Sequence, residues 1–500
     1  MSANELPKSV DPHLPVIVGV GQLLNRTDKG ADPLEPVKLM AEAAAIAETD
    51  TGVTGLLKRA QVVAAAPTIS WRYRDPGAIV AELHGANEAK TWYAVVGGNT
   101  PQSMMNRICS HIQAGELEVA LLVGGEAGRA RKEAKRHGSK PSWTVQTDEV
   151  APDWLDDSPF LMSDEADMAR NLVVPLQLYP VFENAIWHQS GRTLSEHVDF
   201  IGRLWSGYSQ VAATNPFAWK RKAYSPEQIV DVTSDNRMVA FPYRKRMVAN
   251  PSVDMASAAI ICSAGKAAEL GIPTDRWVFV HSASEAKDRS VSTRWDLARS
   301  PAIAAAGHRT LELAGVTIDD VTHLDVYSCY PSAVQVATSE LGIDPSRQLT
   351  VYGGLPFAGG PWNNPVGHAI AAMTDVLRSD PGSLGLVTAN GGNIDKHAFG
   401  IYSTNPPASG FRFTSAQEQA DESPQRPSVV NHEGVAVIES WSVMYDRHSE
   451  PTKAHIAALT PEGERTWALN DDPDVLGLLT TTDATGLTVQ VDGRGNFGLV

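Results

Sequence analysis

Cysteine is scarce in this chain, which has three in 500 residues. Cys109, Cys262 and Cys329 lie far apart and are odd in number, which argues against the disulfide framework of small secreted domains. They also lack the short Cys and His spacings of zinc sites. We therefore expect three packed, reduced thiols, no metal site and no bound cofactor.

Long apolar runs are also missing. No stretch approaches the roughly 18 apolar residues of a membrane-spanning helix, and the polar residues Met1 to His13 are not typical of a signal peptide. We expect a cytoplasmic protein with no membrane span.

Positive charge is in deficit, with 42 Lys and Arg against 58 Asp and Glu and a net charge of −16. Because nucleic acids are held mainly by Lys and Arg, this balance argues against a nucleic-acid partner. Two short basic runs, Lys220 to Lys222 and Arg244 to Arg246, are candidates for holding a small anion. The alternative is that both runs are solvated surface charge.

Short β-branched runs alternate with helical stretches from Val16 to Val123, and again from Trp277 to Thr388. Proline beside a capping residue marks helix starts, for example at Asp32-Pro33 and Thr100-Pro101. This alternation predicts mainly parallel sheets covered by helices. We expect an α/β protein with one half at 1–125 and 236–275 and a second half at 276–410.

Three further segments have other patterns. Residues 126–235 are rich in Trp, Tyr and charge, which is typical of an inserted loop domain over a site. Residues 411–430 are rich in Pro, Ser and Gln and predict a linker. Residues 431–500 change to a period of two with a hairpin signal at Thr460 to Gly463, which predicts a small all-β, OB-like barrel.

Five segments in chain order resemble thiolases, especially those of the sterol-carrier-protein type. They are Glu118 to Glu126, Asn250 to Ala259, Gly315 to Tyr330, Gly353 to Pro361 and Ala389 to Gly392. The resemblance implies the thiolase fold, in which two βαβαβαββ halves form five αβαβα layers. It also implies an acyltransferase scaffold that handles coenzyme A (CoA) thioesters in lipid metabolism, as acetyl-CoA acetyltransferases do. Thiolases are usually dimers or tetramers, although a fused domain is compatible with a monomer or a homodimer.

The same resemblance places the family's catalytic positions on residues that lack their chemistry. The nucleophilic cysteine falls on Gly98, the two histidines on Tyr327 and Gly360, and the second cysteine on Ala389. A thiolase needs a thiolate to take the acyl group, a base and an oxyanion hole. Glycine and alanine side chains supply none of these, so we expect no thiolase activity.

Backbone features of the family remain. A helix still begins at Thr100, and the N–H groups of Gly98, Gly391 and Gly392 can still face a thioester oxygen if they lie as in thiolases. The first candidates for binding the CoA phosphates are Arg244, Lys245 and Arg246. This basic run comes just before Asn250 to Ala259, a segment that borders the pocket in thiolases.

Three side chains are candidates for remaining chemistry. Tyr327 stands at a former histidine position, and a tyrosine can donate or accept a proton. His368 and His397 follow glycine-rich segments and could replace a lost base in space. Instead of taking part in chemistry, Tyr327 could simply line the pocket, and each histidine could have a structural role.

Three functions fit these observations. The first is a protein that binds CoA or an acyl-CoA without thiolase chemistry. The second is a retro-aldolase of the steroid side-chain type, since thiolase-like retro-aldolases lack the cysteine, use tyrosines as acid and base, and pair with a small β-barrel partner. The third is a scaffold whose C-terminal barrel binds another protein.

Overall fold

The computed structural model of the chain describes residue 6, residues 10–156 and residues 163–500. The first half is built on one mixed sheet, in the order β3-β2-β4-β8-β1. Strand β8 runs antiparallel to both of its neighbours, whereas β3, β2 and β4 are parallel. The strands are β1 (Pro15–Leu24), β2 (Val62–Ala65), β3 (Lys90–Tyr93), β4 (Val119–Ala127) and β8 (Asp254–Ser263).

The second half repeats this arrangement in the order β10-β11-β12-β9, again with one antiparallel strand inside the sheet. Its strands are β9 (Val278–Lys287), β10 (His323–Asp325), β11 (Leu384–Gly391) and β12 (Lys396–Ser403). The two sheets meet where β1 pairs with β9, at Val16 and Phe279.

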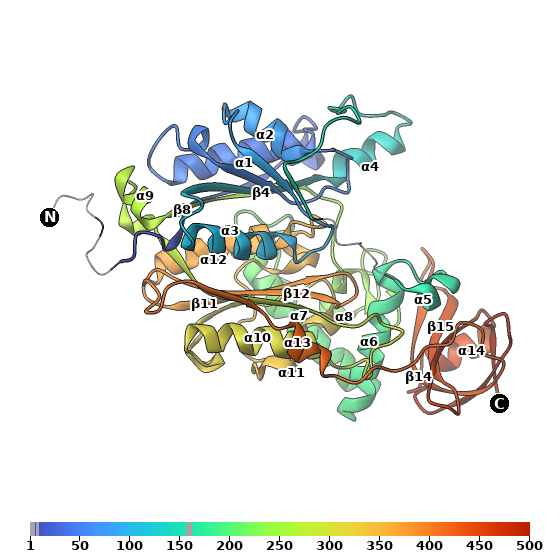
Figure 1. The fold of residues 1–500 in the computed structure, drawn as a ribbon. Helices are drawn as coiled ribbons and strands as arrows, with labels where there is room; N and C mark the ends of the chain where they lie inside the picture. Colours follow the sequence, from blue (N-terminus) through green and yellow to red (C-terminus); the bar gives the residue numbers. More distant parts are fainter. Residues whose placement is uncertain (1–5, 7–9, 157–162) are drawn as a thin grey trace.

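Helices form three layers around these two sheets (Figure 1). Helices α1 (Pro36–Asp50) and α2 (Pro76–His84) cover the first sheet, and α10 (Pro301–Ala314) and α11 (Pro331–Leu341) cover the second. Helices α3 (Thr100–Gln113) and α12 (Pro365–Ser379) fill the space between the sheets. The five-layer αβαβα arrangement expected from the sequence is therefore confirmed.

Helix α1 shows one difference from the sequence prediction, because it begins at Pro36 and not at Pro33. A residue that precedes proline is pushed out of the helical region by the proline ring. Glu35 accordingly has an extended backbone with ψ of 155°, and the helix starts with the next residue. The start of α2 is as predicted, since Asp75 caps it by accepting a hydrogen bond from the Ala78 amide at 3.0 Å.

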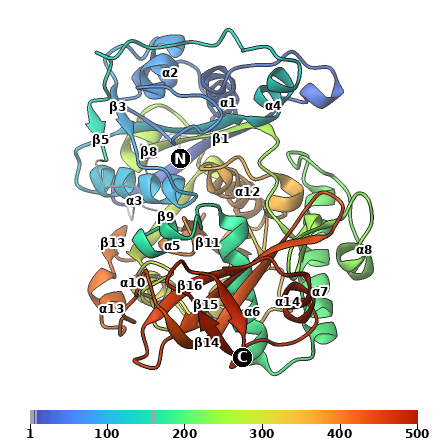
Figure 2. The same ribbon diagram turned by 90° about the vertical axis from the view of Figure 1, so that its right-hand side faces the viewer.

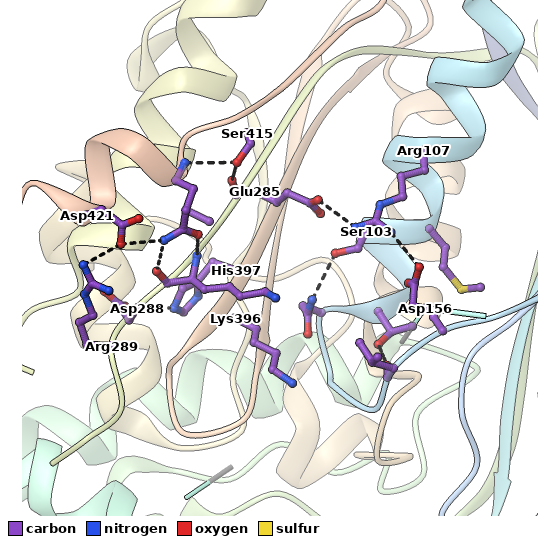
Figure 3. A pocket seen from close by; sticks show the side chains of 18 of the residues that line it. Ser103, Arg107, Asp156, Glu285, Asp288, Arg289, Lys396, His397, Ser415 and Asp421 are labelled. Carbon is purple, nitrogen blue, oxygen red and sulfur yellow. Dashed lines mark hydrogen bonds and ion pairs between the residues drawn. The ribbon is translucent and has the colours of Figure 1, made fainter. Parts of the chain in front are cut away.

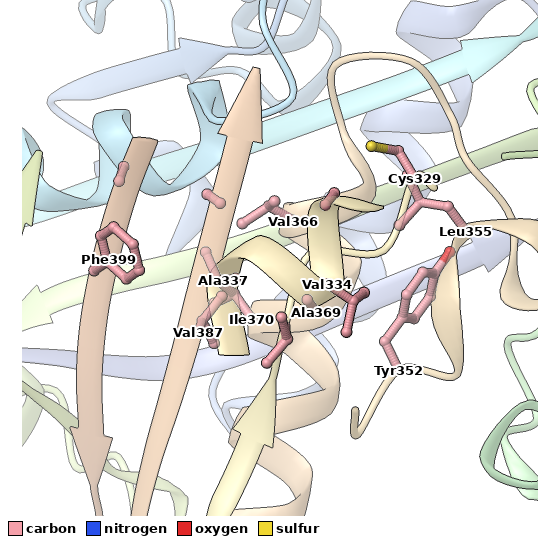
Figure 4. Close-up of a cluster of buried hydrophobic side chains, with 14 of the residues drawn as sticks. Cys329, Val334, Ala337, Tyr352, Leu355, Val366, Ala369, Ile370, Val387 and Phe399 are labelled. Atoms are coloured by element: carbon pink, nitrogen blue, oxygen red, sulfur yellow. The ribbon is translucent and has the colours of Figure 1, made fainter. Parts of the chain in front are cut away.

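The core of the second half packs two helices against two strands (Figure 4). Val334 and Ala337 of α11, Val366 and Ile370 of α12, and Phe399 of β12 belong to one buried hydrophobic cluster. Cys329 belongs to the same cluster. All three cysteines are free and buried, so the expectation of packed thiols is confirmed.

Residues 165–230 form helices beside the second half of the layered body (Figure 2), whereas Trp154 and Leu155 pair in parallel with Trp92 and Tyr93 at the edge of the first sheet. The longest elements are two helices joined at Gly191, whose φ is +65°. The bounds in this part of the chain are α4 (Gly128–Arg136), β5 (Trp154–Leu155), α5 (Glu165–Ala169), α6 (Pro175–Ser190), α7 (Leu194–Thr214), α8 (Pro226–Val230), β6 (Met238–Ala240), β7 (Tyr243–Arg244) and, after β8, α9 (Ala264–Glu269).

The C-terminal region forms an antiparallel sheet, distinct from the first two, in the order β16-β15-β14-β17-β18, and β6 pairs with β14 at Ala240 and Met444. A bridge between Leu469 and Asn496 joins its two ends, so the sheet closes on itself as a small barrel. Its elements are β14 (Gly434–Tyr445), β15 (Pro451–Leu459), β16 (Arg465–Asn470), α14 (Pro473–Leu479), β17 (Thr488–Val491) and β18 (Phe497–Leu499).

Residues 411–430, for which a linker was expected, contain regular structure. Strand β13 (Arg412–Ser415) pairs in parallel with β9, and α13 (Gln417–Asp421) follows it. The Arg426 amide then donates to the Thr293 carbonyl at 2.9 Å. This segment therefore adds a strand to the second sheet before the chain enters the barrel.

Buried polar contacts fasten the barrel to helix α6 and to the chain after β9. The Asn184 amide group donates to the Trp441 carbonyl at 2.8 Å. Arg465, fully buried, forms an ion pair with Glu439 at 2.7 Å and donates to the carbonyls of Val291 and Ser292 at 2.9 and 3.1 Å. Because each of these groups would be costly to bury alone, the barrel is held in one position.

No helix among the described residues is long and apolar enough to cross a membrane.

Candidate functional site

Gly98 lies in the turn Gly97–Asn99, which connects β3 to α3 and is here called the central turn. A Cβ atom on Gly98 would lie 2.5 Å from the Asn390 carbonyl oxygen and 2.8 Å from Cζ of Tyr327, and it would overlap the Tyr327 hydroxyl. These separations are well below van der Waals contact. Position 98 therefore accepts only glycine unless its surroundings move.

The Gly391 end of β11 packs against the same turn. A Cβ atom on Gly391 would lie 3.2 Å from Cα of Gly97 and would overlap the Asn99 side chain. Gly392 follows with φ of +65°, a conformation that favours glycine. The structure thus brings Gly98, Tyr327, Gly391 and Gly392 into one place, although they come from opposite halves of the chain.

Tyr327 follows β10 and is held by its backbone, whose amide donates to Thr388 Oγ1 at 2.9 Å. The side chain is partly exposed, but its hydroxyl is turned inward toward Gly98. Burial raises its pKa well above the usual 10, and the nearby Cys329 and Tyr330 add to the shift. The hydroxyl therefore remains protonated at neutral pH and can donate a hydrogen bond.

An aromatic wall stands beside this tyrosine. Tyr179 of α6 donates to the Gly392 carbonyl at 3.0 Å and accepts from the Asn390 amide group at 3.1 Å. Its ring stacks on Tyr330 with 4.1 Å between centroids. Burial raises the pKa of the Cys329 thiol to about 12, so that thiol is neutral at physiological pH. Tyr179 and Asn390 were missed from the sequence.

A cluster of cations lies where Lys220, Lys245 and Arg246 approach one another. Burial lowers the pKa of Lys220, and repulsion from Lys245 and Arg246 lowers it further. No ion pair in the described part of the chain involves these three residues. On a protein of net charge −16, such an unneutralised group favours an anionic ligand.

Arg244 is engaged with the local backbone, and Arg246 is partly so, since it donates to the Gln228 carbonyl at 2.6 Å. The Arg244 guanidinium donates to the Val230 carbonyl at 2.8 Å and to the Pro242 carbonyl at 2.7 Å. These contacts hold the local chain. The third cation of the cluster is therefore Lys220, which comes from the other basic run, and not Arg244.

Backbone hydrogen bonds connect the cation cluster to Cys329, which lies near Tyr327 and the central turn. The Lys220 amide donates to the Phe357 carbonyl at 2.8 Å, and the Asn250 amide donates to the Leu355 carbonyl at 3.1 Å. The Ala249 amide then donates to the Cys329 carbonyl at 2.9 Å. Residues 249–250 and 355–357 are therefore hydrogen-bonded to each other, to Lys220 at one end and to Cys329 at the other. Cys329 is two residues from Tyr327.

Comparison with known proteins agrees with this geometry. A monomeric SCP2-thiolase-like protein type 1 from Mycobacterium smegmatis superposes with a TM-score of 0.84 at 29% identity, over 98% of this chain and 100% of that chain. Residues 415–496 match the family model of the thiolase-like protein type 1 additional C-terminal domain. Over nearly its whole length the chain is similar to an SCP2-thiolase-like protein. The resemblance read from the sequence is confirmed.

More distant relatives share the fold. The dimeric peroxisomal thiolase of Saccharomyces cerevisiae matches with a TM-score of 0.56 at 14% identity, over 81% of this chain and 100% of that chain. The Ltp2-ChsH2(DUF35) aldolase matches with 0.57 at 18% identity, over 79% of this chain and 99% of that chain. An acetyl-CoA acetyltransferase of Methanothermobacter thermautotrophicus is 26% identical over 234 residues, which are 46% of this chain and 58% of that protein.

The two histidine candidates lie in different surroundings. His368 is fully buried in α12, where Nδ1 lies 2.9 Å from Gln22 Oε1 and the ring stacks on Tyr352 at 5.7 Å. Burial lowers its pKa to about 3, so it stays neutral. No described hydrogen bond or ring contact joins it to Tyr327.

His397 lies at the start of β12, on the wall of a cavity beside the central turn. Its Nε2 atom is 3.4 Å from Asp288 Oδ2. The structure therefore separates the three candidates: Tyr327 is at the central turn, His397 is near it, and His368 is in the core. No group of three or more His, Cys, Asp or Glu among the described residues has a geometry that could hold a metal ion.

Proposed function

We propose that this thiolase-like protein binds a CoA thioester without performing thiolase chemistry. The observation that carries the proposal is the contact between Gly98 and Tyr327. Where the thiolase resemblance puts a nucleophilic cysteine, the chain has a glycine, and a tyrosine hydroxyl fills the adjacent space. No acyl group can be transferred to position 98, whereas the hydroxyl and nearby amides can donate hydrogen bonds to a thioester oxygen.

The cation cluster supports the CoA part of the proposal. The phosphates of CoA are multiply charged, and Lys220, Lys245 and Arg246 offer three positive charges at the far end of the hydrogen-bonded segments from Tyr327. Pantetheine would lie along 249–250 and 355–357. The role in lipid metabolism rests on the same resemblance and belongs to the proposal.

A calorimetric titration with CoA tests this function. We expect binding that weakens as salt is added, since the contacts are between charges. Lys220, Lys245 and Arg246 changed together to Met should lower the affinity by at least about tenfold, because each lost phosphate contact is charge-assisted.

The matched control changes Lys132, Lys135 and Arg136 of α4 to Met, which removes the same charge from another surface. Equal losses in both triple variants would reduce the effect to net charge and contradict the assigned phosphate site. An absence of binding at millimolar CoA would contradict the proposed function itself.

Carbon–carbon bond cleavage of an acyl-CoA is the second candidate. Tyr327 favours it, because a buried phenol can act as the acid of a retro-aldol reaction. The reaction also needs a base, and the titratable neighbours of Tyr327 do not supply one: burial raises the pKa of both Cys329 and Tyr330. Release of an aldehyde or ketone from a β-hydroxyacyl-CoA, lost in Tyr327→Phe, would favour this candidate over binding alone.

A further inference from the structure

Helix α4 and the residues after it carry a dense cluster of positive charge. Residues 128–140 contain six Lys and Arg and one acidic residue, Glu133, in a chain whose net charge is −16. The helix lies at an outer corner of the first half, away from the C-terminal barrel (Figure 1 and Figure 2). Four exposed cations share one face of it, because they are one, four or five positions apart: Arg131, Lys132, Lys135 and Arg136. These four and the exposed Lys140 are here called the basic patch.

Most of the patch is not neutralised within the protein. Arg136 pairs with Glu133 at 2.5 Å, but Glu133 also pairs with Arg129 at 3.2 Å, so one carboxylate is shared. Cations four positions apart on a helix repel each other, and the face has two such pairs. A negatively charged partner would relieve this repulsion. Three cations form no hydrogen bond or ion pair with any residue that the structure describes: Lys132, Lys135 and Lys140.

Cations beside the central turn are arranged differently. There, in a cavity of about 690 Å³, Arg107 pairs with Asp156 at 3.1 Å and with Glu285 at 3.3 Å (Figure 3). Arg289 pairs with Asp421 at 3.0 Å in the same cavity. Unpaired cations are therefore not the rule in this chain, and the basic patch is a particular feature of α4.

Apolar side chains border the basic patch. Arg131 donates to the Ile69 carbonyl at 2.8 Å, and Ile69 is 37% exposed. Trp71, two residues further on, packs edge-on against Trp143 with 5.2 Å between ring centroids. Its indole N–H donates at 2.8 Å to the carbonyl of the residue before Val145, which is 75% exposed. Two exposed aliphatic side chains and a half-buried tryptophan pair thus lie next to the cations.

This combination is typical of a surface that binds an anionic membrane. Lipid headgroups attract clustered Lys and Arg, and the boundary below them accepts aliphatic and indole side chains. A nucleic-acid backbone is bound mainly through the charges alone. Lysine is depleted in protein–protein interfaces, and fixing its long side chain there costs entropy. A fluid lipid surface does not require one fixed geometry, which suits the three unpaired lysines.

The negative net charge of the chain is compatible with such a contact. At physiological salt, exposed charges more than about 8 to 10 Å apart are largely screened from each other. The acidic C-terminal barrel lies away from α4 (Figure 1). Attraction to a lipid surface is therefore determined by the residues close to that surface, and on this side of the molecule they are the basic patch.

We propose that the basic patch, with Ile69 and Val145, docks this protein on membranes that carry anionic lipids, without a helix crossing them. The docking surface does not depend on the proposed function. It does add to it, because the Gly128 amide at the start of α4 donates to the Val253 carbonyl at 3.0 Å, three residues after Asn250. Docking would hold the pantetheine segment near a lipid surface, into which long acyl chains partition.

Co-sedimentation of the full chain with vesicles tests the proposal. Phosphatidylcholine vesicles are compared with vesicles in which about one third of the lipid is phosphatidylglycerol. At about 0.1 M salt, binding to the anionic vesicles should be at least about tenfold tighter, since each Lys or Arg near such a surface contributes about fivefold. High salt should abolish the difference. Equal binding to both kinds of vesicle, or binding to neither, would overturn the proposal.

Charge-reversed variants locate the contact. Changing Lys132, Lys135 and Lys140 together to Glu should weaken binding to anionic vesicles by at least about tenfold. The matched control reverses three exposed cations of the barrel and should bind as tightly as the unaltered protein: Arg447→Glu, Lys453→Glu and Arg494→Glu. Equal losses in both triple variants would reduce the effect to net charge and overturn the assigned patch. Equal midpoints of urea unfolding show that both variants are folded.

The apolar part of the contact separates a membrane from other polyanions. Val145→Ser should weaken vesicle binding by at least about threefold, because it removes exposed apolar surface from the lipid boundary. Duplex DNA and polyglutamate serve as soluble polyanions. If either binds as tightly as the anionic vesicles do and Val145→Ser changes nothing, the patch binds a nucleic acid or an acidic protein and the membrane assignment is overturned. Because no CoA is present, these outcomes leave the proposed function intact, and a failure of CoA binding leaves this proposal intact.

Discussion

The hydroxyl of Tyr327 occupies the space that a side chain on Gly98 would need, with Cζ of the tyrosine only 2.8 Å from the position of such a Cβ atom. The two residues come from opposite halves of the chain, so this contact also fixes how the halves meet. The missing side chain at position 98 and the inward hydroxyl of Tyr327 are therefore two parts of one packing arrangement.

Gly98→Ala should accordingly destabilise the protein by about 1 to 3 kcal/mol, the usual cost of overpacking a core. The double variant with Tyr327→Ala should recover only part of this loss, because the Asn390 carbonyl remains 2.5 Å from the added atom. Urea unfolding of the single and double variants measures the loss of unfolding free energy in Gly98→Ala and the part that Tyr327→Ala recovers. Full recovery in the double variant would show that Tyr327 alone closes position 98.

Gly98→Cys should likewise remain inactive in thiolysis of acetoacetyl-CoA. The added thiol would need space that Tyr327 holds, and positions 327, 360 and 389 still lack the family's other side chains. Turnover above that of the unaltered protein, in a preparation free of thiolase, would contradict this expectation.

Much of the fold follows from local sequence signals. Alternating β-branched runs and Pro-marked helix starts predict both sheets, and the order of the thiolase-like motifs predicts that Gly98, Tyr327 and Gly391 lie at one site. The Tyr179 contact could not be predicted in this way. It joins α6 to Gly392, 213 residues along the chain, and nothing in the local pattern of α6 indicates that partner.

The two basic runs also show that local sequence does not predict tertiary contacts. Each run is visible as a short cluster of Lys and Arg, but which members face a common space depends on tertiary packing. Arg244 satisfies two backbone carbonyls, whereas Lys220 joins Lys245 and Arg246 from 25 residues away. Segment 411–430 is a further case, because its composition is typical of a linker while its backbone finds a partner in β9.

His368 should give the protein a distinct acid sensitivity. Burial lowers its pKa from 6.5 to about 3, so between these values the unfolded chain binds a proton that the folded chain does not. Stability from this residue is present above pH 6.5 and is lost as the pH falls, by about 1.4 kcal/mol per unit. The difference in unfolding free energy between the unaltered protein and His368→Gln should shrink accordingly from pH 6.5 to 4.5. His448→Gln, at an exposed position, should show no such trend.

The thiols should be unreactive in the folded protein. All three cysteines are buried, and burial raises the pKa of each, to about 12 for Cys329. Because the thiolate is the reactive form, Ellman's reagent at pH 8 should titrate no thiol in native protein and three in urea. Rapid reaction of one native thiol, absent in Cys329→Ser, would identify Cys329 as accessible and reopen a chemical role for it.

Arg465 should be the residue on which attachment of the C-terminal barrel depends most strongly. Its guanidinium joins Glu439 of the barrel to the carbonyls of Val291 and Ser292 in the second half. Two residues further on, Arg294 donates to the Ile394 carbonyl at 2.6 Å, just after the Gly391–Gly392 turn.

Arg465→Met should therefore cost about 3 to 5 kcal/mol, since it leaves several buried carbonyls without a donor and leaves Glu439 with only the 3.9 Å ion pair to Arg426. Adding Glu439→Leu should restore part of that loss, because the weakly compensated charge is then removed. The exposed Arg447→Met is the matched control and should change stability by less than about 0.5 kcal/mol. Urea unfolding measures all four proteins. A loss in Arg465→Met no larger than that in Arg447→Met would mean that this ion pair does not fasten the barrel, and that the contacts of α6 with Trp441 carry the attachment.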